Sequence, residues 1–189
     1  MSLELPDLNP KPLTSEIEKQ KSEKEIFWEQ KVSRANEIVD GLGKGIDENI
    51  KDAIVAFSVH GFTTSASCEG HSGEDPDDGN SPFPWIEVSV PEPEGWEEDE
   101  AKRRECYLEE LKLQQKMLPF LEEFYRDRET PFDAKLTFSQ IGFSGFHVQS
   151  FGAKLMDLLT PKEQAQKREI YRKEMRDFAV FLKGKYFSS

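Results

Sequence analysis

Two short runs of alternating apolar and polar residues, with two glycines between them, constrain the fold more than any other stretch. Residues 134–151 read AKLTFSQIGFSGFHVQSF. Leu136 and Phe138 alternate with polar residues in the first run, as Phe146 and Val148 do in the second. A period of two is typical of half-buried strands, and glycine between such runs marks a turn. This stretch therefore predicts a hairpin of two strands.

Two further strands and four helices complete the expected elements. Residues 84–90, PWIEVSV, alternate in the same way, and residues 62–66 are rich in threonine. Helices are expected where apolar residues recur every three to four positions and where caps, glycine or proline set the ends. They cover residues 15–40, starting at a Ser15–Glu18 capping box; 47–60; 99–124, with a kink or restart at Pro119; and 161–183, begun by a Thr160–Glu163 capping box and ended by Gly184.

The order of these elements predicts an α+β fold. Strands separated by helices and a hairpin favour a small mixed sheet of about four strands packed by helices. The N- and C-terminal helices are expected to be long and charged. Residues 1–13 contain three prolines and are expected to form an extended arm ahead of a single domain, residues 14–189.

Charge and cysteine content narrow the classes of function. The chain has 37 acidic and 25 basic side chains, a net charge of -12, which argues against nucleic acid and an anionic membrane surface as partners. It has no apolar run long enough for a membrane span and no secretory signal pattern. Cys68 and Cys106 are too few for a disulfide scaffold, so reduced thiols in a cytoplasmic protein are expected.

The side chains best suited to catalysis or metal binding lie in SASCEGH, residues 65–71. Cys68 and His71 are three residues apart, and Gly70 lets the backbone turn or approach a ligand closely. One option is a thiol nucleophile activated by an imidazole, and another is a zinc site with Cys-x-x-His spacing. No second ligand pair follows, so the sequence assigns no set of metal ligands. A ligand-binding loop without covalent chemistry and a purely structural loop are the alternatives.

His147 is the third candidate for chemistry. If Phe146 and Val148 face the core, His147 points to the other face of the sheet beside Gln149. It is then either an ordinary surface histidine or a group that faces the SASCEGH loop. The leading hypothesis is a small-molecule pocket between this loop and the strand of His147. Its expected catalytic residues are Cys68, His71 and His147, and its expected ligand-binding residues are Thr63, Thr64, Ser67, Glu69 and Gly70.

The same stretch is similar to the wybutosine-synthesising tRNA methyltransferase family. That family has a T-T-S-S-C-x-G-R motif on a strand and loop, and this chain has T-T-S-x-S-C-x-G-H, with His71 in place of the arginine. PWIEVSV resembles the family's next strand, and His147 with Val148 fits a later His-Val pair. The loop also resembles a T-x-x-S-C-x-G-H loop of bacterial and phage proteins.

This resemblance implies S-adenosylmethionine as cofactor and tRNA as substrate, whereas the Cys-x-x-His pair leaves zinc as the alternative cofactor. Two hypotheses therefore stand beside the small-molecule pocket. One is a divergent RNA-modifying enzyme that uses S-adenosylmethionine. The other is a non-enzymatic protein whose charged helices, residues 14–40 and 161–183, form a homodimer or bind a partner.

Overall fold

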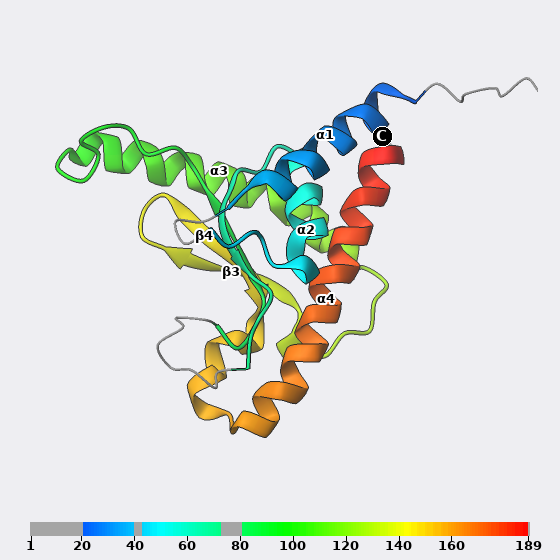
Figure 1. The fold of residues 1–189 in the computed structure, drawn as a ribbon. Helices are drawn as coiled ribbons and strands as arrows, with labels where there is room; N and C mark the ends of the chain where they lie inside the picture. Colours follow the sequence, from blue (N-terminus) through cyan, green and yellow to red (C-terminus); the bar gives the residue numbers. More distant parts are fainter. Residues whose placement is uncertain (1–20, 40–42, 73–80, 189) are drawn as a thin grey trace, which may run out of the picture.

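The structure, a computed structural model, describes residues 21–39, 43–72 and 81–188 (Figure 1). Within them, four strands form one sheet in the order β1-β2-β4-β3. The strands are β1 (Thr64–Cys68), β2 (Trp85–Ser89), β3 (Leu136–Ile141) and β4 (Gly145–Ser150). The helices are α1 (Glu23–Glu37), α2 (Glu48–Val59), α3 (Glu100–Tyr125) and α4 (Pro161–Ser188), with 3-10 segments η2 (Phe132–Ala134) and η3 (Phe151–Leu158).

The predicted α+β class and the four strands are confirmed, but the pairing within the sheet is not mixed. All three strand pairs are antiparallel. The reason for the outer pair is local: the chain turns back after β1, where the His71 N–H donates to the Ser81 carbonyl at 2.9 Å. Strand β2 therefore returns beside β1 in the opposite direction, and β3 and β4 form the expected hairpin.

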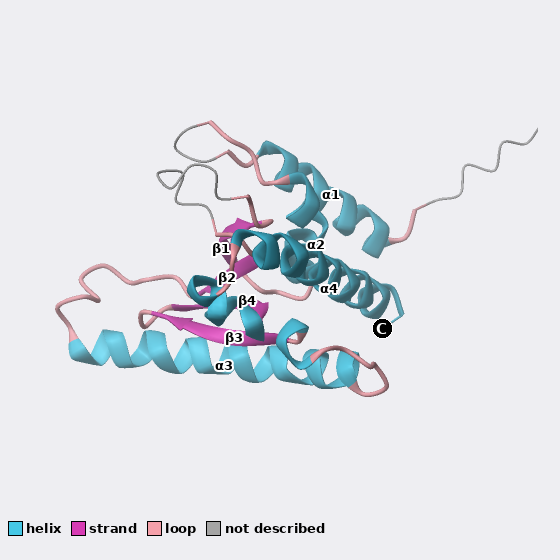
Figure 2. Cartoon of the chain, turned by 90° about the horizontal axis from the view of Figure 1, so that it is seen from below, coloured by secondary structure: helices cyan, strands magenta, loops and turns pink. Residues whose placement is uncertain are grey.

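One face of the sheet carries the apolar core. Ile86 and Val88 of β2 and Phe146 and Val148 of β4 are fully buried there. Helices α2, α3 and α4 supply the facing side chains, among them Phe57, Met117 and Phe178. Figure 2 shows α3 beside the β3–β4 hairpin and α1, α2 and α4 grouped together, with α4 also in contact with β4. The polar residues between the core positions of β2 and β4 point to the opposite face.

Helix α2 leads directly into the first strand. The predicted apolar stripe is confirmed, because Ile50, Ala53, Ile54 and Phe57 are all buried. Gly61 ends the helix at a φ of +74°, a conformation that glycine adopts at low cost. Strand β1 begins two residues later than expected, so Cys68 is its last residue and not part of a loop.

The ends of the other helices agree with the sequence in part. Ser22 caps α1 in a capping box with Glu25, whereas the predicted start at Ser15 and the arm at 1–13 lie outside the described residues. Helix α3 continues past Pro119 as one element. The expected stop at Gly184 is wrong, because α4 runs on to Ser188 and Tyr186 packs against Trp28 of α1. None of the described helices is both long and apolar enough to cross a membrane.

Candidate functional site

Three chemically different side chains converge at the end of β1: a carboxylate, a thiol and an imidazole. Asp47 is the residue before α2, Cys68 ends β1, and His71 follows three residues later. One ligand atom from each lies within 4.8 Å of the other two. We call these three residues the Asp47 cluster.

Each of the three side chains of the Asp47 cluster makes at least one hydrogen-bond contact. Asp47 Oδ2 lies 3.1 Å from His71 Nε2 and accepts the Glu69 N–H at 3.1 Å. The Cys68 thiol accepts the Gly70 N–H at 3.3 Å and lies 3.7 Å from the Ser81 carbonyl. Cys68 is 5% exposed, whereas the side chains of Asp47 and His71 are about one third exposed. The cluster therefore has a buried sulfur at its base and an open side toward solvent.

Burial raises the pKa of the Cys68 thiol, and the nearby Asp47 and Glu69 carboxylates act in the same direction. The hydrogen bonds from Gly70 and to Ser81 oppose this rise in pKa. Without a bound cation, Cys68 is therefore a neutral thiol at pH 7. A metal ion at the cluster would reverse this, because a coordinated thiol is deprotonated.

Glu69 ties three segments of the site together. Its Oε2 accepts the backbone N–H of Asn49 at 2.9 Å, in the first turn of α2. Its Oε1 pairs with Arg172 Nη2 of α4 at 3.3 Å. The Arg172 guanidinium also donates to the backbone carbonyls of Glu69, at 2.9 Å, and of Gly70. These bonds hold the residues after Cys68 against α2 and α4.

The backbone is unusual on both sides of Cys68. Before it, β1 has one more residue than β2 between the Thr64–Val88 and Ser67–Ile86 pairs. Such an irregularity can change the direction in which a side chain points. After it, Gly70 has a φ of +84°, and a Cβ there would lie 2.9 Å from the Phe83 carbonyl carbon. Only glycine fits this close approach without a shift of the backbone.

Of the predicted ligand-binding residues, Thr64 and Ser67 lie in β1 and Thr63 directly precedes it. Thr64 pairs with Val88 and Ser67 with Ile86 in the ladder, while the Thr63 carbonyl accepts the Ser89 N–H. None of the described hydrogen bonds joins the side chains of Thr63, Thr64 or Ser67 to the Asp47 cluster. Their role in binding a ligand therefore stays a prediction, whereas Glu69 and Gly70 have the positioning contacts described above.

His147 belongs to a different group of residues. It points away from the core, as predicted, and its ring stacks on Trp85 with centroids 4.1 Å apart. Its Nε2 lies 3.5 Å from Glu87 Oε2, on the residue directly opposite in β2. Burial lowers the pKa of His147, and the Glu87 carboxylate opposes this. We call Trp85, Glu87 and His147 the sheet-face group; among the described residues, His147 is not one of those whose ligand atoms gather within 4.8 Å.

Sequence reasoning missed Asp47 and Arg172 as members of the site. Asp47 carried a signal, because an aspartate directly before an amphipathic helix is a typical N-cap, but its side chain faces the β1 end instead. Arg172 carried none, since it is one of many charged residues on a long helix and lies about a hundred positions from the loop it holds.

Comparison of the chain with protein-family models, with curated proteins and with solved structures finds no match. The resemblance to the wybutosine-synthesising family, and the S-adenosylmethionine and tRNA that it implies, therefore stay predictions.

Proposed function

We propose that the Asp47 cluster binds a transition-metal ion of the zinc class and that this ion is the centre of the predicted ligand-binding or catalytic site. The observation that supports this is the convergence of Asp47, Cys68 and His71 from different segments. Carboxylate oxygen, thiolate sulfur and imidazole nitrogen are the three ligand types of protein zinc sites. Three protein ligands with one position left open is the arrangement of catalytic zinc.

The geometry is close to that of a metal site and needs only side-chain movement to reach it. Zinc–ligand bonds are roughly 2.0–2.3 Å long, so the ligand atoms must approach to within about 4 Å of one another. Asp47 and His71 are partly exposed and can turn toward the sulfur, while Cys68 is held by its two backbone contacts. Asp47 would then exchange its bond to His71 Nε2 for a bond to the ion.

The open side of the cluster defines what the site would do. A small ligand or water would reach a bound ion from the solvent side, past Asp47 and His71. A zinc-bound water is acidic enough to supply hydroxide near neutral pH, and a zinc ion also polarises a carbonyl or phosphoryl oxygen. Glu69 and Arg172 would keep the ligand set in place from behind.

Binding of Zn²⁺ and Co²⁺ to the metal-free full-length chain tests this proposal. Isothermal titration should give one Zn²⁺ per chain, and Co²⁺ should produce a thiolate-to-metal charge-transfer band. The Cys68→Ser variant should lose that band, whereas Cys106→Ser should keep it, because Cys106 is buried on α3 outside the cluster. The absence of one-to-one binding, or a band that survives Cys68→Ser, would refute the proposed site.

One observation favours a second candidate function, thiol catalysis without a metal. The 3.1 Å contact between His71 and Asp47 supplies the orienting carboxylate that the sequence did not identify. Cys68, His71 and Asp47 would then be nucleophile, base and orienting group. The raised pKa of the Cys68 thiol and its burial argue against this candidate.

The rate of iodoacetamide labelling as a function of pH separates the two candidates. Measured on Cys106→Ser, so that Cys68 is the only thiol, a catalytic pair should react rapidly near pH 6 and lose that reactivity in His71→Ala. A metal site freed of metal should react slowly below about pH 9, and Zn²⁺ should protect it further.

A further inference from the structure

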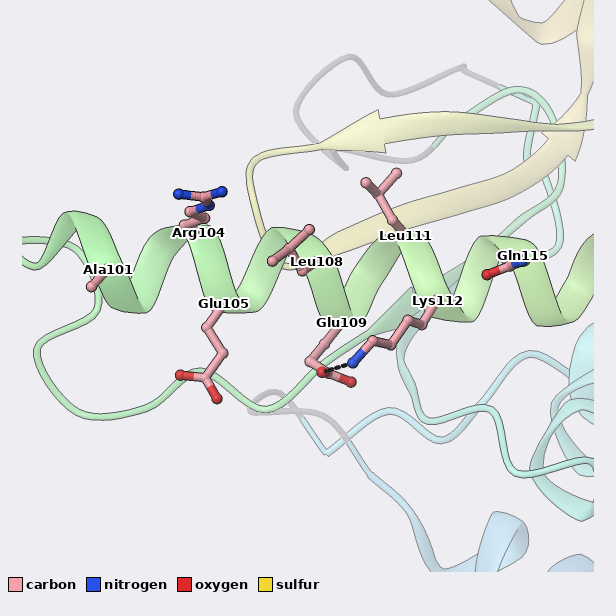
Figure 3. A pocket seen from close by; sticks show the side chains of 8 residues that line it. All are labelled: Ala101, Arg104, Glu105, Leu108, Glu109, Leu111, Lys112 and Gln115. Atoms are coloured by element: carbon pink, nitrogen blue, oxygen red, sulfur yellow. Dashed lines mark hydrogen bonds and ion pairs between the residues drawn. The ribbon is translucent and has the colours of Figure 1, made fainter.

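Helix α3 carries an apolar stripe on the side that faces away from its own core. Its buried residues include Cys106, Glu110, Met117 and Leu121, which turn toward the sheet. The stripe lies on the opposite side, where Leu108, Leu111 and Leu118 are 47%, 39% and 46% exposed. Figure 3 shows a shallow groove along this side, with Leu111 and Arg104 projecting on one side and Glu105 and Lys112 on the other.

The spacing of the stripe is that of a coiled coil. Leu108, Leu111 and Leu118 lie on a row of positions that are three and four residues apart in strict alternation, and these three leucines are exposed. Lys102 and Arg103, which are not on this row, donate to the Glu94 and Glu97 carbonyls and hold the 94–97 segment against the start of α3. A three-four spacing over five turns is the seam of a two-helix coiled coil. In order along the helix, the seam positions are Ala101, Arg104, Leu108, Leu111, Gln115 and Leu118.

We propose that this seam docks on the same seam of a second copy of the chain, with the two α3 helices antiparallel about a twofold axis between Leu108 and Leu111. In this register, Leu108 meets the partner's Leu111, and Ala101 meets the partner's Leu118, a small residue against a large one. Arg104 meets the partner's Gln115, whose amide oxygen accepts from a guanidinium. Every pair occurs twice, as a twofold interface requires.

Charge complementarity selects this orientation and this partner. Beside the seam, Glu105 of each chain lies next to Lys112 of the partner subunit, which gives two opposite-charge pairs flanking the central leucines. In a parallel pair, Arg104 would face the partner's Arg104 and the two charges would repel. Because the seam is complementary to itself in side-chain size and in charge, the partner that fits it best is a second copy of this chain. This interface is on α3, not on the terminal helices of the dimer hypothesis, and does not depend on the metal site.

Sedimentation of the full chain between about 5 and 200 µM tests the proposal. The chain should show a reversible monomer–dimer equilibrium in this range, and Leu111→Glu should weaken it by at least a hundredfold. Val180→Glu is the matched control, since Val180 is 71% exposed on α4 and should leave the equilibrium unchanged. Circular dichroism should show that both variants fold. A monomer at 200 µM, or a dimer that tolerates Leu111→Glu, would overturn the interface.

A charge swap tests the antiparallel register. Lys112→Glu alone sets Glu105 against a partner glutamate twice, and Glu105→Lys alone sets two lysines against each other. Each should weaken the dimer about tenfold, and the effect should shrink in high salt. The double variant Glu105→Lys/Lys112→Glu restores opposite charges and should return the dissociation constant to within about twofold of the original. If the double variant is as weak as the singles, the register is wrong.

Discussion

Two groups in this protein each place a histidine beside a carboxylate, and they differ in what surrounds the pair. In the Asp47 cluster the two atoms are 3.1 Å apart, next to a buried thiol and an irregular backbone. In the sheet-face group they are 3.5 Å apart, within a regular ladder in which Glu87 and His147 are direct cross-strand partners. A carboxylate–histidine pair inside a ladder is accounted for by cross-strand pairing alone. The pair beside Cys68 is not, and this marks it as the better candidate for chemistry.

Replacing the histidine of each group should produce the largest difference between them, measured as the loss of Zn²⁺ affinity. His71→Ala should weaken Zn²⁺ binding at least a hundredfold, because it removes one of the three proposed ligands, and a factor of this size is about 3 kcal/mol of binding free energy. His147→Gln should leave the affinity within about twofold. Titration calorimetry of both variants measures the difference. Equal losses in the two variants would mean that the sheet-face group belongs to the metal site after all.

Two glycines with positive φ, one next to the Asp47 cluster and one in the β3–β4 turn, should differ almost as clearly in how much an alanine at each position lowers stability. Gly70→Ala should lower the free energy of unfolding by about 3 kcal/mol, because it adds left-handed strain and a Cβ contact of 2.9 Å with the Phe83 backbone. Gly142 in the β3–β4 turn also has a positive φ, +57°, but nothing lies within 4 Å of its Cβ position. Gly142→Ala should therefore cost only about 1 kcal/mol, the strain alone.

Urea unfolding of the two alanine variants measures these losses. The comparison would fail if Gly142→Ala cost as much as Gly70→Ala. In that case, the close approach of residues 70 and 83 would contribute nothing, and the site would be less tightly built than its contacts indicate.

Removing Glu69, next to the Asp47 cluster, should destabilise the fold more than removing Glu87 of the sheet-face group, although the difference should be smaller than for the glycines. Glu69→Ala removes the acceptor for the first turn of α2 and the partner of Arg172, and should destabilise the fold by about 2 kcal/mol. Glu87→Ala removes bonds to Ser65 and His147 on a more open face and should cost about 1 kcal/mol or less. Thermal unfolding of the two variants in the same buffer gives the ranking, and a larger loss for Glu87→Ala would contradict it.

The smallest expected effect is a pH dependence of stability from the sheet-face group. The pKa of His147 is lowered in the folded chain, so the unfolded chain takes up this proton first as the pH falls. Its contribution to stability is fully present above the ordinary pKa of 6.5 and is lost progressively below it. The stability of the wild type should therefore fall more steeply between pH 7.5 and 5.5 than that of His147→Gln. Parallel curves for the two proteins would show that His147 titrates alike in both states.

The sequence predicted those features of the fold that depend on local patterns. Alternation in the hairpin and the strand at 85–89, the stripe of α2 and the Thr160–Glu163 cap all describe neighbours within a few residues, and the structure confirms them. Gly184 misled because a glycine ends a helix only where packing does not continue, and Tyr186 still finds aromatic partners. The antiparallel pairing of β1 with β2 was not predicted, since it depends on the return of the chain that brings His71 to Ser81, which no short-range pattern records.

The candidate site was predicted in part for the same reason. Cys68 and His71 are close in sequence, so their spacing indicated that they share a space. Asp47 comes from twenty-one positions before Cys68 and depends on how α2 meets β1, which no short-range pattern records. His147 was grouped with them because it is a rare residue, whereas register places it opposite Glu87.

The hydrogen bonds from two arginines of α4 to the segment after β1 have a consequence for protein engineering. Arg172 holds Glu69 and Gly70 at one end of this segment, and Arg168 donates to the Pro82 carbonyl at the other, at 2.9 Å. The His71–Ser81 hydrogen bond closes the two ends onto each other. Because these anchors hold both ends of the segment, lengthening the chain between Ser72 and Ser81 should not move the proposed metal ligands. A peptide tag or fluorescent reporter inserted there should leave the Zn²⁺ affinity of the proposed site unchanged.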